Sequence, residues 1–113
     1  MAFDQVSTIK GSSVQYKMSD QAKKYTFRDL GFIETKQGNL QYDRPLDMTV
    51  SKSGPRLKIT VAKDLKTLKM SVTTPNGLRQ INIFEDDSFK DLQQNFDFIL
   101  SEMVKRGCFD IVD

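Results

Sequence analysis

The chain has 113 residues, of which 38% are hydrophobic and 28% charged, and this composition suits one globular domain with a single core. Histidine is absent and Cys108 is the single cysteine, so the commonest general base, the commonest transition-metal ligand and any internal disulfide are excluded. No long apolar run and no basic-then-apolar leader is present, so we expect neither a membrane span nor a secretory signal. We predict one cytoplasmic domain spanning residues 1–113.

The first half of the chain is expected to form two hairpins separated by a short helix. Segments 3–10 and 14–18 flank a Gly-Ser-Ser turn, and segments 32–36 and 40–44 flank a turn containing Gly38 and Asn39. Between the hairpins, Thr26 can cap a brief helix over residues 26–30 that Gly31 ends. Pro45 has no backbone donor and should stop the fourth strand, so residues 46–55 are predicted to form a long surface loop.

Residues 57–84 carry the clearest strand pattern. Apolar and polar residues alternate over 57–61 and 68–73, and turn residues before 78–84 indicate a third strand in which Ile81 and Ile83 face inward. If these strands pair as a meander, one face of the sheet is polar and faces water or a ligand. That polar face would hold Lys58, Thr60, Lys69, Ser71, Thr73, Gln80 and Asn82.

An amphipathic helix is predicted over residues 88–106. Its apolar face consists of residues at three-four spacing, namely Phe89, Leu92, Phe96, Ile99, Leu100 and Met103. Ser88 and Asp91 are typical of a capping box, Gly107 of a left-handed helix stop, and the apolar tail 108–112 must pack against the sheet or the helix end. We therefore expect an α+β fold, with an antiparallel, curved sheet and, on one of its faces, this long helix and a short helix near residues 20–30.

Charge is segregated along the chain. Residues 56–79 contain six basic residues against one acidic residue, whereas residues 85–113 contain eight acidic residues against three basic ones. One interpretation is an ordinary solvated face on each element. The other is an anion-facing sheet, with Lys58 and Lys69 on its basic face, kept apart from an acidic helix.

Two short clusters and one further arginine are candidate anion-binding sites. Arg28 with Asp29 and Arg44 with Asp47 each lie in a short turn, and Arg79 lies beside the Asn76-Gly77 turn. Arginine can hold a carboxylate or phosphate through two parallel hydrogen bonds. The alternative is that each cluster is a structural ion pair between the arginine and its neighbouring aspartate.

The sequence shows no catalytic constellation, metal site or cofactor motif, so we expect the chain not to be an enzyme. Cys108 lacks a histidine base and a partner cysteine, and its position between Gly107 and Phe109 favours a packed apolar role over a nucleophilic one. The acidic residues 85–87 do not match a calcium loop and suit the N-terminus of the helix. The glycines are isolated turn residues rather than a nucleotide-binding loop.

Several runs resemble a family of small proteins of unknown function from lactic acid bacteria. These runs are YTFRDLGFIETKQG at 25–38, LKITVAKDL at 57–65, MSVTTPNGLRQINIF at 70–84 and the segment 98–107. The resemblance covers nearly the whole chain and implies an α+β fold remotely similar to the TATA-binding-protein arrangement. It also implies a role in amino-acid metabolism, near cysteine desulfuration and transfer-RNA sulfur modification, and it assigns no functional residue.

We therefore predict a non-catalytic ligand-binding or accessory protein of amino-acid or sulfur metabolism, whose partner is a small anion or another protein. The alternative is binding of transfer RNA through the basic sheet face, against which stands the lack of aromatic residues for base stacking on that face. A third option is a protein-interaction module or homodimer that uses a sheet edge or the tail 108–112.

Overall fold

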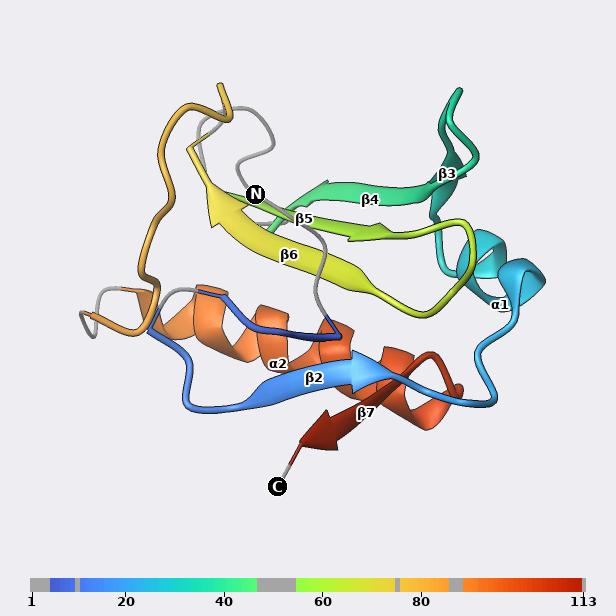
Figure 1. The fold of residues 1–113 in the computed structure, drawn as a ribbon. Coiled ribbons are helices and arrows are strands. Elements are labelled where there is room, and N and C mark those ends of the chain that lie inside the picture. Colours follow the sequence, from blue (N-terminus) through green and yellow to red (C-terminus); the bar gives the residue numbers. More distant parts are fainter. Residues whose placement is uncertain (1–4, 10, 47–54, 75, 86–88, 113) are drawn as a thin grey trace.

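The strands form two antiparallel sheets (Figure 1) in the computed structural model, which describes residues 5–9, 11–46, 55–74, 76–85 and 89–112. In the smaller sheet, β2 lies between β1 and β7; in the larger, β3, β4, β5 and β6 pair in chain order. The strands are β1 (Val6–Ser7), β2 (Gln15–Met18), β3 (Ile33–Glu34), β4 (Leu40–Pro45), β5 (Arg56–Val61), β6 (Leu68–Thr73) and β7 (Phe109–Val112). The helices are α1 (Lys24–Asp29) and α2 (Lys90–Lys105). The predicted α+β class is confirmed, with two sheets instead of one.

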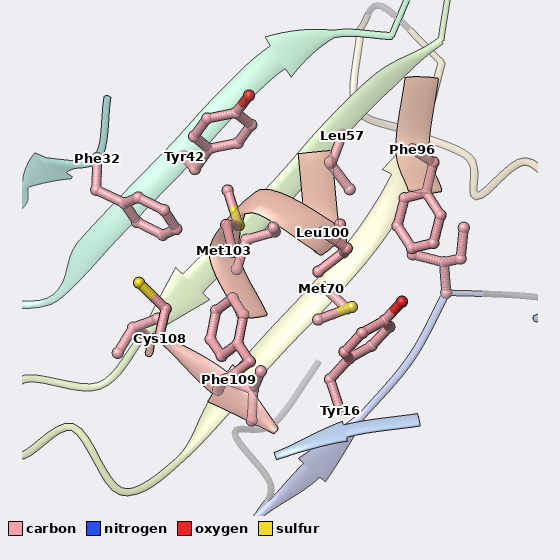
Figure 2. Packing of buried hydrophobic residues seen from close by; sticks show 14 of the residues in the cluster. Tyr16, Phe32, Tyr42, Leu57, Met70, Phe96, Leu100, Met103, Cys108 and Phe109 are labelled. Carbon is pink, nitrogen blue, oxygen red and sulfur yellow. The ribbon is translucent and has the colours of Figure 1, made fainter. Parts of the chain in front are cut away.

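Helix α2 runs beneath the larger sheet with the smaller sheet beside it (Figure 1). Its buried residues are Leu92, Phe96, Leu100 and Met103, which all belong to the predicted apolar face. Phe96 lies near the ring of Tyr16 from β2, at a centroid distance of 6.5 Å (Figure 2). Its centroid is 6.3 Å from that of Phe84. One helix face therefore supplies the core that both sheets share.

Side-chain alternation gives the larger sheet two chemically different faces. In β5, Leu57, Ile59 and Val61 are fully buried, whereas the residues between them are half-buried. β6 repeats this pattern from Leu68 to Val72. Because successive side chains of a strand point to opposite faces, the apolar set covers α2 and the polar set faces away from it.

The predicted third meander strand over 78–84 is wrong. Among residues 76–85, pairing with β6 is limited to one isolated bridge between Thr73 and Gln80, and β4 occupies the other side of β5. The reason is local: Asn82 Oδ1 accepts a hydrogen bond from the Phe84 backbone N–H at 2.9 Å, which bends the chain. Ile83 is then fully buried and Ile81 packs partly against the core, so the predicted inward positions are confirmed.

Two contacts join the sheets. The backbone N–H of Met70 in β6 donates to Ser7 Oγ in β1 at 3.2 Å. A row of aromatic rings also connects β7 to β4 through α1, with centroid distances of 5.8, 5.0 and 5.3 Å along the series Phe109, Phe27, Phe32 and Tyr42. The two sheets are thus joined by a backbone-to-side-chain hydrogen bond and by a row of rings in edge-on or tilted contact.

The remaining local predictions have mixed outcomes. Both predicted hairpins form, with β1 and β2 in the first and β3 and β4 in the second. α1 begins after Lys23, which makes no side-chain cap. The predicted Thr26 cap is wrong, because Thr26 lies inside the helix.

The ends of the predicted loop over residues 46–55 are joined by a hydrogen bond from the Leu46 backbone N–H to Pro55 O at 3.0 Å. Its residues 47–54 lie outside the described residues. Ser88, the first residue of the predicted capping box of α2, also lies outside them.

The end of α2 is a Schellman motif built on Gly107. Gly107 has φ of +81°, its N–H bonds to Val104 O at 3.1 Å, and Cys108 N bonds to Met103 O at 2.9 Å. This reversal lets β7 pair with β2, where Phe109 lies opposite Met18. The prediction that the apolar tail packs against a sheet is confirmed.

We expect Gly107→Ala to lower the free energy of unfolding by about 1 kcal/mol, because alanine is strained at positive φ. No atom lies within 4 Å of a Cβ placed there, so steric clash adds nothing. Gly107→Asn should cost less, since asparagine tolerates this conformation. Urea unfolding is the measurement, with exposed Ser101→Ala as the helix control; equal stability of Gly107→Ala and wild type would contradict the assignment.

Candidate functional site

A hollow of about 390 Å³ lies on the polar face of the larger sheet. Strands β4, β5 and β6 form its floor, and the turn after β6 supplies one wall. Its lining residues are Gln41, Lys58, Thr60, Lys69, Met70, Ser71, Thr73, Gly77, Leu78, Arg79 and Gln80. The prediction that these strands share a polar face is confirmed for five of its residues on β5 and β6. We call this feature the basic hollow.

Three cations line the basic hollow, and none of its described lining residues is acidic. Lys58 and Lys69 project from neighbouring strands, and Arg79 comes from the turn that replaces the predicted third strand. Asp43 lies directly opposite Lys58 in the strand register, but Arg56 Nε holds its carboxylate at 2.8 Å. Asp43 is therefore already paired with Arg56, and it is not among the residues that line the hollow.

The turn approaches the sheet closely at Gly77. A Cβ at this position would lie 3.1 Å from Lys58 Nζ, so the missing side chain leaves room for the ammonium group. Nearby, Thr73 is 6% exposed, and its hydroxyl has no hydrogen-bond partner among the described residues. A buried hydroxyl is costly without a partner, so the end of β6 in the floor of the hollow offers a hydrogen-bonding group to a ligand.

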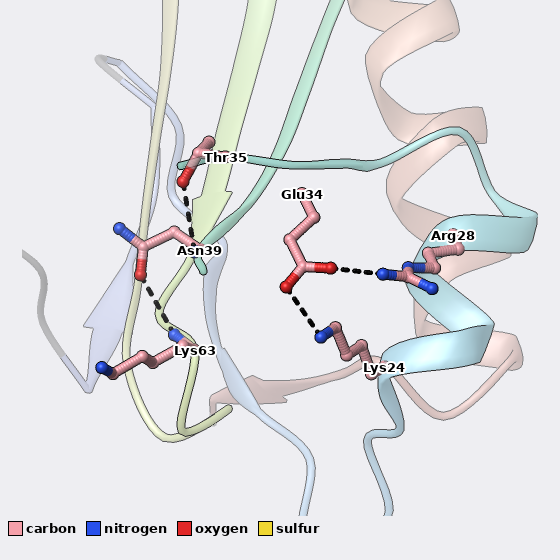
Figure 3. Close-up of polar contacts among 6 residues, drawn as sticks. All are labelled: Lys24, Arg28, Glu34, Thr35, Asn39 and Lys63. Atoms are coloured by element: carbon pink, nitrogen blue, oxygen red, sulfur yellow. Dashed lines mark hydrogen bonds and ion pairs between the residues drawn. The ribbon is translucent and has the colours of Figure 1, made fainter. Parts of the chain in front are cut away.

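Arg28 lies outside the basic hollow, in an ion-pair cluster that joins α1 to β3 (Figure 3). Glu34 accepts hydrogen bonds from Lys24 Nζ at 2.9 Å and from Arg28 Nη2. These bonds lower the pKa of Glu34, with Lys24 as the larger cause and Arg28 as the second. The structural pair expected for Arg28 therefore forms with Glu34, whereas Asp29 approaches Arg106 at 4.0 Å.

Arg44 projects to the other side of β4. Its guanidinium carbon lies 5.8 Å from the centroid of the Tyr42 ring, and it lines a groove toward α2 instead of the basic hollow. Asp47, its expected neighbour, lies outside the described residues. The predicted sites thus separate into three places: the basic hollow, the Glu34 cluster and the groove beside α2.

Cys108 is fully buried, as the packed interpretation predicts. Burial raises the pKa of its thiol to about 11, against a smaller lowering by Arg106. A protonated, inaccessible thiol is a poor nucleophile. Among the described residues no group of three His, Cys, Asp or Glu side chains could hold a metal ion, and neither described helix has the length and apolar character needed to cross a bilayer.

Three features of the site were not visible in the sequence. Gln41 joins the hollow because β4 pairs with β5, and Gly77 and Leu78 join it because the turn folds back over the sheet. Strand alternation could have placed Gln41 on the polar face only once the pairing partner of β5 was known. The groove beside α2 is lined by residues of β4 and of α2, which lie about fifty positions apart in the sequence. No local sequence pattern could predict that they lie side by side.

The fold and the hollow define a class of small α+β proteins in which two antiparallel sheets enclose one long helix and present a basic face. Residues 1–110 match a family whose description reads "DUF1831: Putative amino acid metabolism". The crystal structure of a DUF1831 family protein from Lactobacillus plantarum is similar to this chain, with 32% sequence identity, a TM-score of 0.91 and 99% of each chain covered. No functionally curated protein matches. The chain belongs to the DUF1831 family, as the resemblance predicted.

We expect the Glu34 cluster to stabilise the fold at neutral pH and not in acid. Because the folded-state pKa is lowered, the stabilisation is fully present above the ordinary glutamate pKa of 4.5 and is lost as pH falls through the lower folded value. Glu34→Gln should therefore lower the urea midpoint at pH 7 and have little effect in strong acid. Glu85→Gln, at an exposed position, is the control. If the urea midpoints of wild type and Glu34→Gln differed as much in acid as at pH 7, the Glu34 carboxylate would not be the source of the stabilisation.

We expect native Cys108 to react slowly with a disulfide reagent. Raising the pKa from 9.0 to about 11 reduces the thiolate fraction at pH 7 about a hundredfold, and burial slows the reaction further. In denaturing urea the same thiol should react at the rate of free cysteine. Rapid reaction of the folded protein would show that the thiol is accessible and reopen a nucleophilic role.

Proposed function

We propose that this protein binds a small, hydrophilic anion of amino-acid metabolism in the basic hollow and has no catalytic activity of its own. The single observation that carries the proposal is the convergence of Lys58, Lys69 and Arg79 on one hollow that has no acidic residue among its described lining. A carboxylate or phosphate is the ligand group that complements such a gathering of ammonium and guanidinium groups.

The construction of the hollow supports binding of a small molecule. Lys58 and Lys69 are half-buried and line the hollow, and the Lys58 ammonium group lies beside Gly77 in its wall. Thr60, Ser71 and Gln41 add neutral hydrogen-bonding groups at its floor. A volume of about 390 Å³ falls within the range of small-molecule sites.

The family description supports the metabolic part of the proposal, because metabolites of amino-acid metabolism carry carboxylates and often phosphates. A narrower connection to cysteine or sulfur metabolism rests on the family resemblance alone. The non-catalytic part is supported by the absence of histidine from the sequence and by the burial of Cys108.

Binding of transfer RNA through the same face is the alternative. The positive charge would suit phosphates, but none of the described lining residues is aromatic, and single-stranded bases are usually held on aromatic rings. The alternative therefore has electrostatic support without a means of base recognition.

The test is an amide-shift NMR titration at low salt with O-phospho-L-serine, with L-serine as the matched probe that lacks the phosphate. We expect shifts around Lys58, Ser71 and Arg79 with the phosphorylated probe alone. Lys58→Met and Arg79→Met should each weaken binding about tenfold through loss of a charge-assisted hydrogen bond. Lys36→Met removes an exposed charge outside the hollow and should leave the affinity unchanged.

If about 10 mM O-phospho-L-serine caused no shift at the hollow, the Kd would be too weak for a physiological ligand, and the proposal would be overturned. A single-stranded RNA oligonucleotide should be titrated in parallel. If RNA shifted the same amides with a steep salt dependence while O-phospho-L-serine had no effect, the nucleic-acid alternative would replace the proposal.

A further inference from the structure

A second concave site lies on the opposite side of β4, between this strand and α2. It has a volume of about 410 Å³ and is lined by Tyr42, Arg44, Pro45, Asn95, Phe98 and Ile99. Side-chain alternation along β4 directs Gln41 to the basic hollow and Tyr42 and Arg44 toward the helix side of the sheet. The groove therefore shares no lining residue with the basic hollow and is a separate site.

Most of the groove wall is apolar. Phe98 is 68% exposed on a helix whose other large apolar residues are buried or half-buried. Ile99 beside it packs partly against the core. The polar groups are few and one is fixed, because Asn95 Nδ2 donates to Leu46 O at 2.7 Å. An apolar wall with a small number of oriented polar groups is typical of a small-molecule site.

Arg44 places a positive charge at this apolar wall. Its guanidinium carbon lies 5.8 Å from the centroid of the Tyr42 ring, and its Nη2 is so close to Gly31 that a Cβ there would be 2.8 Å away. Among the described carboxylates, none forms an ion pair with Arg44, in contrast to Arg28 and Arg56. A held guanidinium beside uncovered apolar surface is complementary to a carboxylate that bears an apolar group.

We propose that this groove binds a small monocarboxylic acid with an apolar or aromatic side chain. The carboxylate pairs with Arg44, and the side chain covers Phe98 and Ile99. Apolar amino acids and their deaminated acids have this chemistry. The site differs from the basic hollow, whose three cations and polar floor suit a more highly charged, hydrophilic anion.

The test is an amide-shift titration of the full chain with phenylacetate, and with phenylacetamide as the probe of the same shape without charge. Phenylacetate is expected to shift the signals of Asn95, Phe98 and Ile99 and to bind about tenfold more tightly than phenylacetamide. L-phenylalanine, titrated next, should shift the same signals. Equal binding of the amide, or shifts confined to other residues, would overturn the proposal.

Variants separate this site from the basic hollow. Arg44→Met should weaken phenylacetate binding about tenfold and leave phenylacetamide binding unchanged. Phe98→Ser, which alters an exposed residue and should leave the fold intact, should weaken both probes. Arg79→Met should have no effect on either probe, although it impairs binding in the basic hollow, so the two proposals can fail independently.

A second copy of the chain is the competing occupant of the groove. The Phe98 and Ile99 signals are therefore recorded over a range of protein concentrations without probe. We expect them to be independent of concentration. Concentration-dependent shifts that phenylacetate does not reverse would show that another copy covers the groove and would overturn the proposal.

Discussion

Burial of one face of α2 against two sheets is the interaction on which the rest of the structure depends. The four buried residues of this helix are spaced along almost its full length, so both sheets pack on the same apolar stripe. Neither sheet could bury its own apolar face alone: the smaller one has three short strands, and β3 in the larger one has two residues. The smaller sheet also depends on the Schellman motif at Gly107, because this motif reverses the chain after α2 and brings β7 beside β2.

Strand alternation then divides the surface into two chemical environments. The helix side of the larger sheet is apolar and includes the groove that Arg44 and Phe98 both line, whereas the outer side carries Lys58 and Lys69. Each strand thus contributes to the core and to a binding surface at once. Both proposed sites are formed by rigid strands or the long helix, with one turn added in the basic hollow, which favours well-defined geometry.

The charged residues also divide by their neighbours into those paired with a carboxylate on an adjacent strand or helix and those gathered around the basic hollow. Arg28 and Arg56 are held by carboxylates on neighbouring elements, and such exposed pairs add modest stability. The cations that line the basic hollow have no carboxylate among its described lining residues. Together with a buried, protonated Cys108, this distribution favours recognition of anions over covalent chemistry.

The sequence by itself determined α2, its apolar face and its glycine stop, because helical periodicity and capping are local properties. It also determined the alternation of β5 and β6, and hence the polar face with Lys58 and Lys69. Only the tertiary structure decided that β4 pairs with β5, and that the segment 78–84 makes one isolated bridge to β6 instead of forming a full strand. Strand pairing depends on contacts between distant residues, so local alternation cannot choose between two partners of similar pattern.

The same limit applies to the candidate sites. The sequence identified Arg28 and Arg44 as candidates and Arg79 as a weaker third one, since each lies near a turn and the local pattern does not show what surrounds it. The structure separated them by their surroundings. Arg28 pairs with a carboxylate, Arg44 lies over an aromatic ring beside an apolar groove, and Arg79 lines the same hollow as two lysines. Those surroundings come from elements brought together by folding, and they decide which positive charge is available to a ligand.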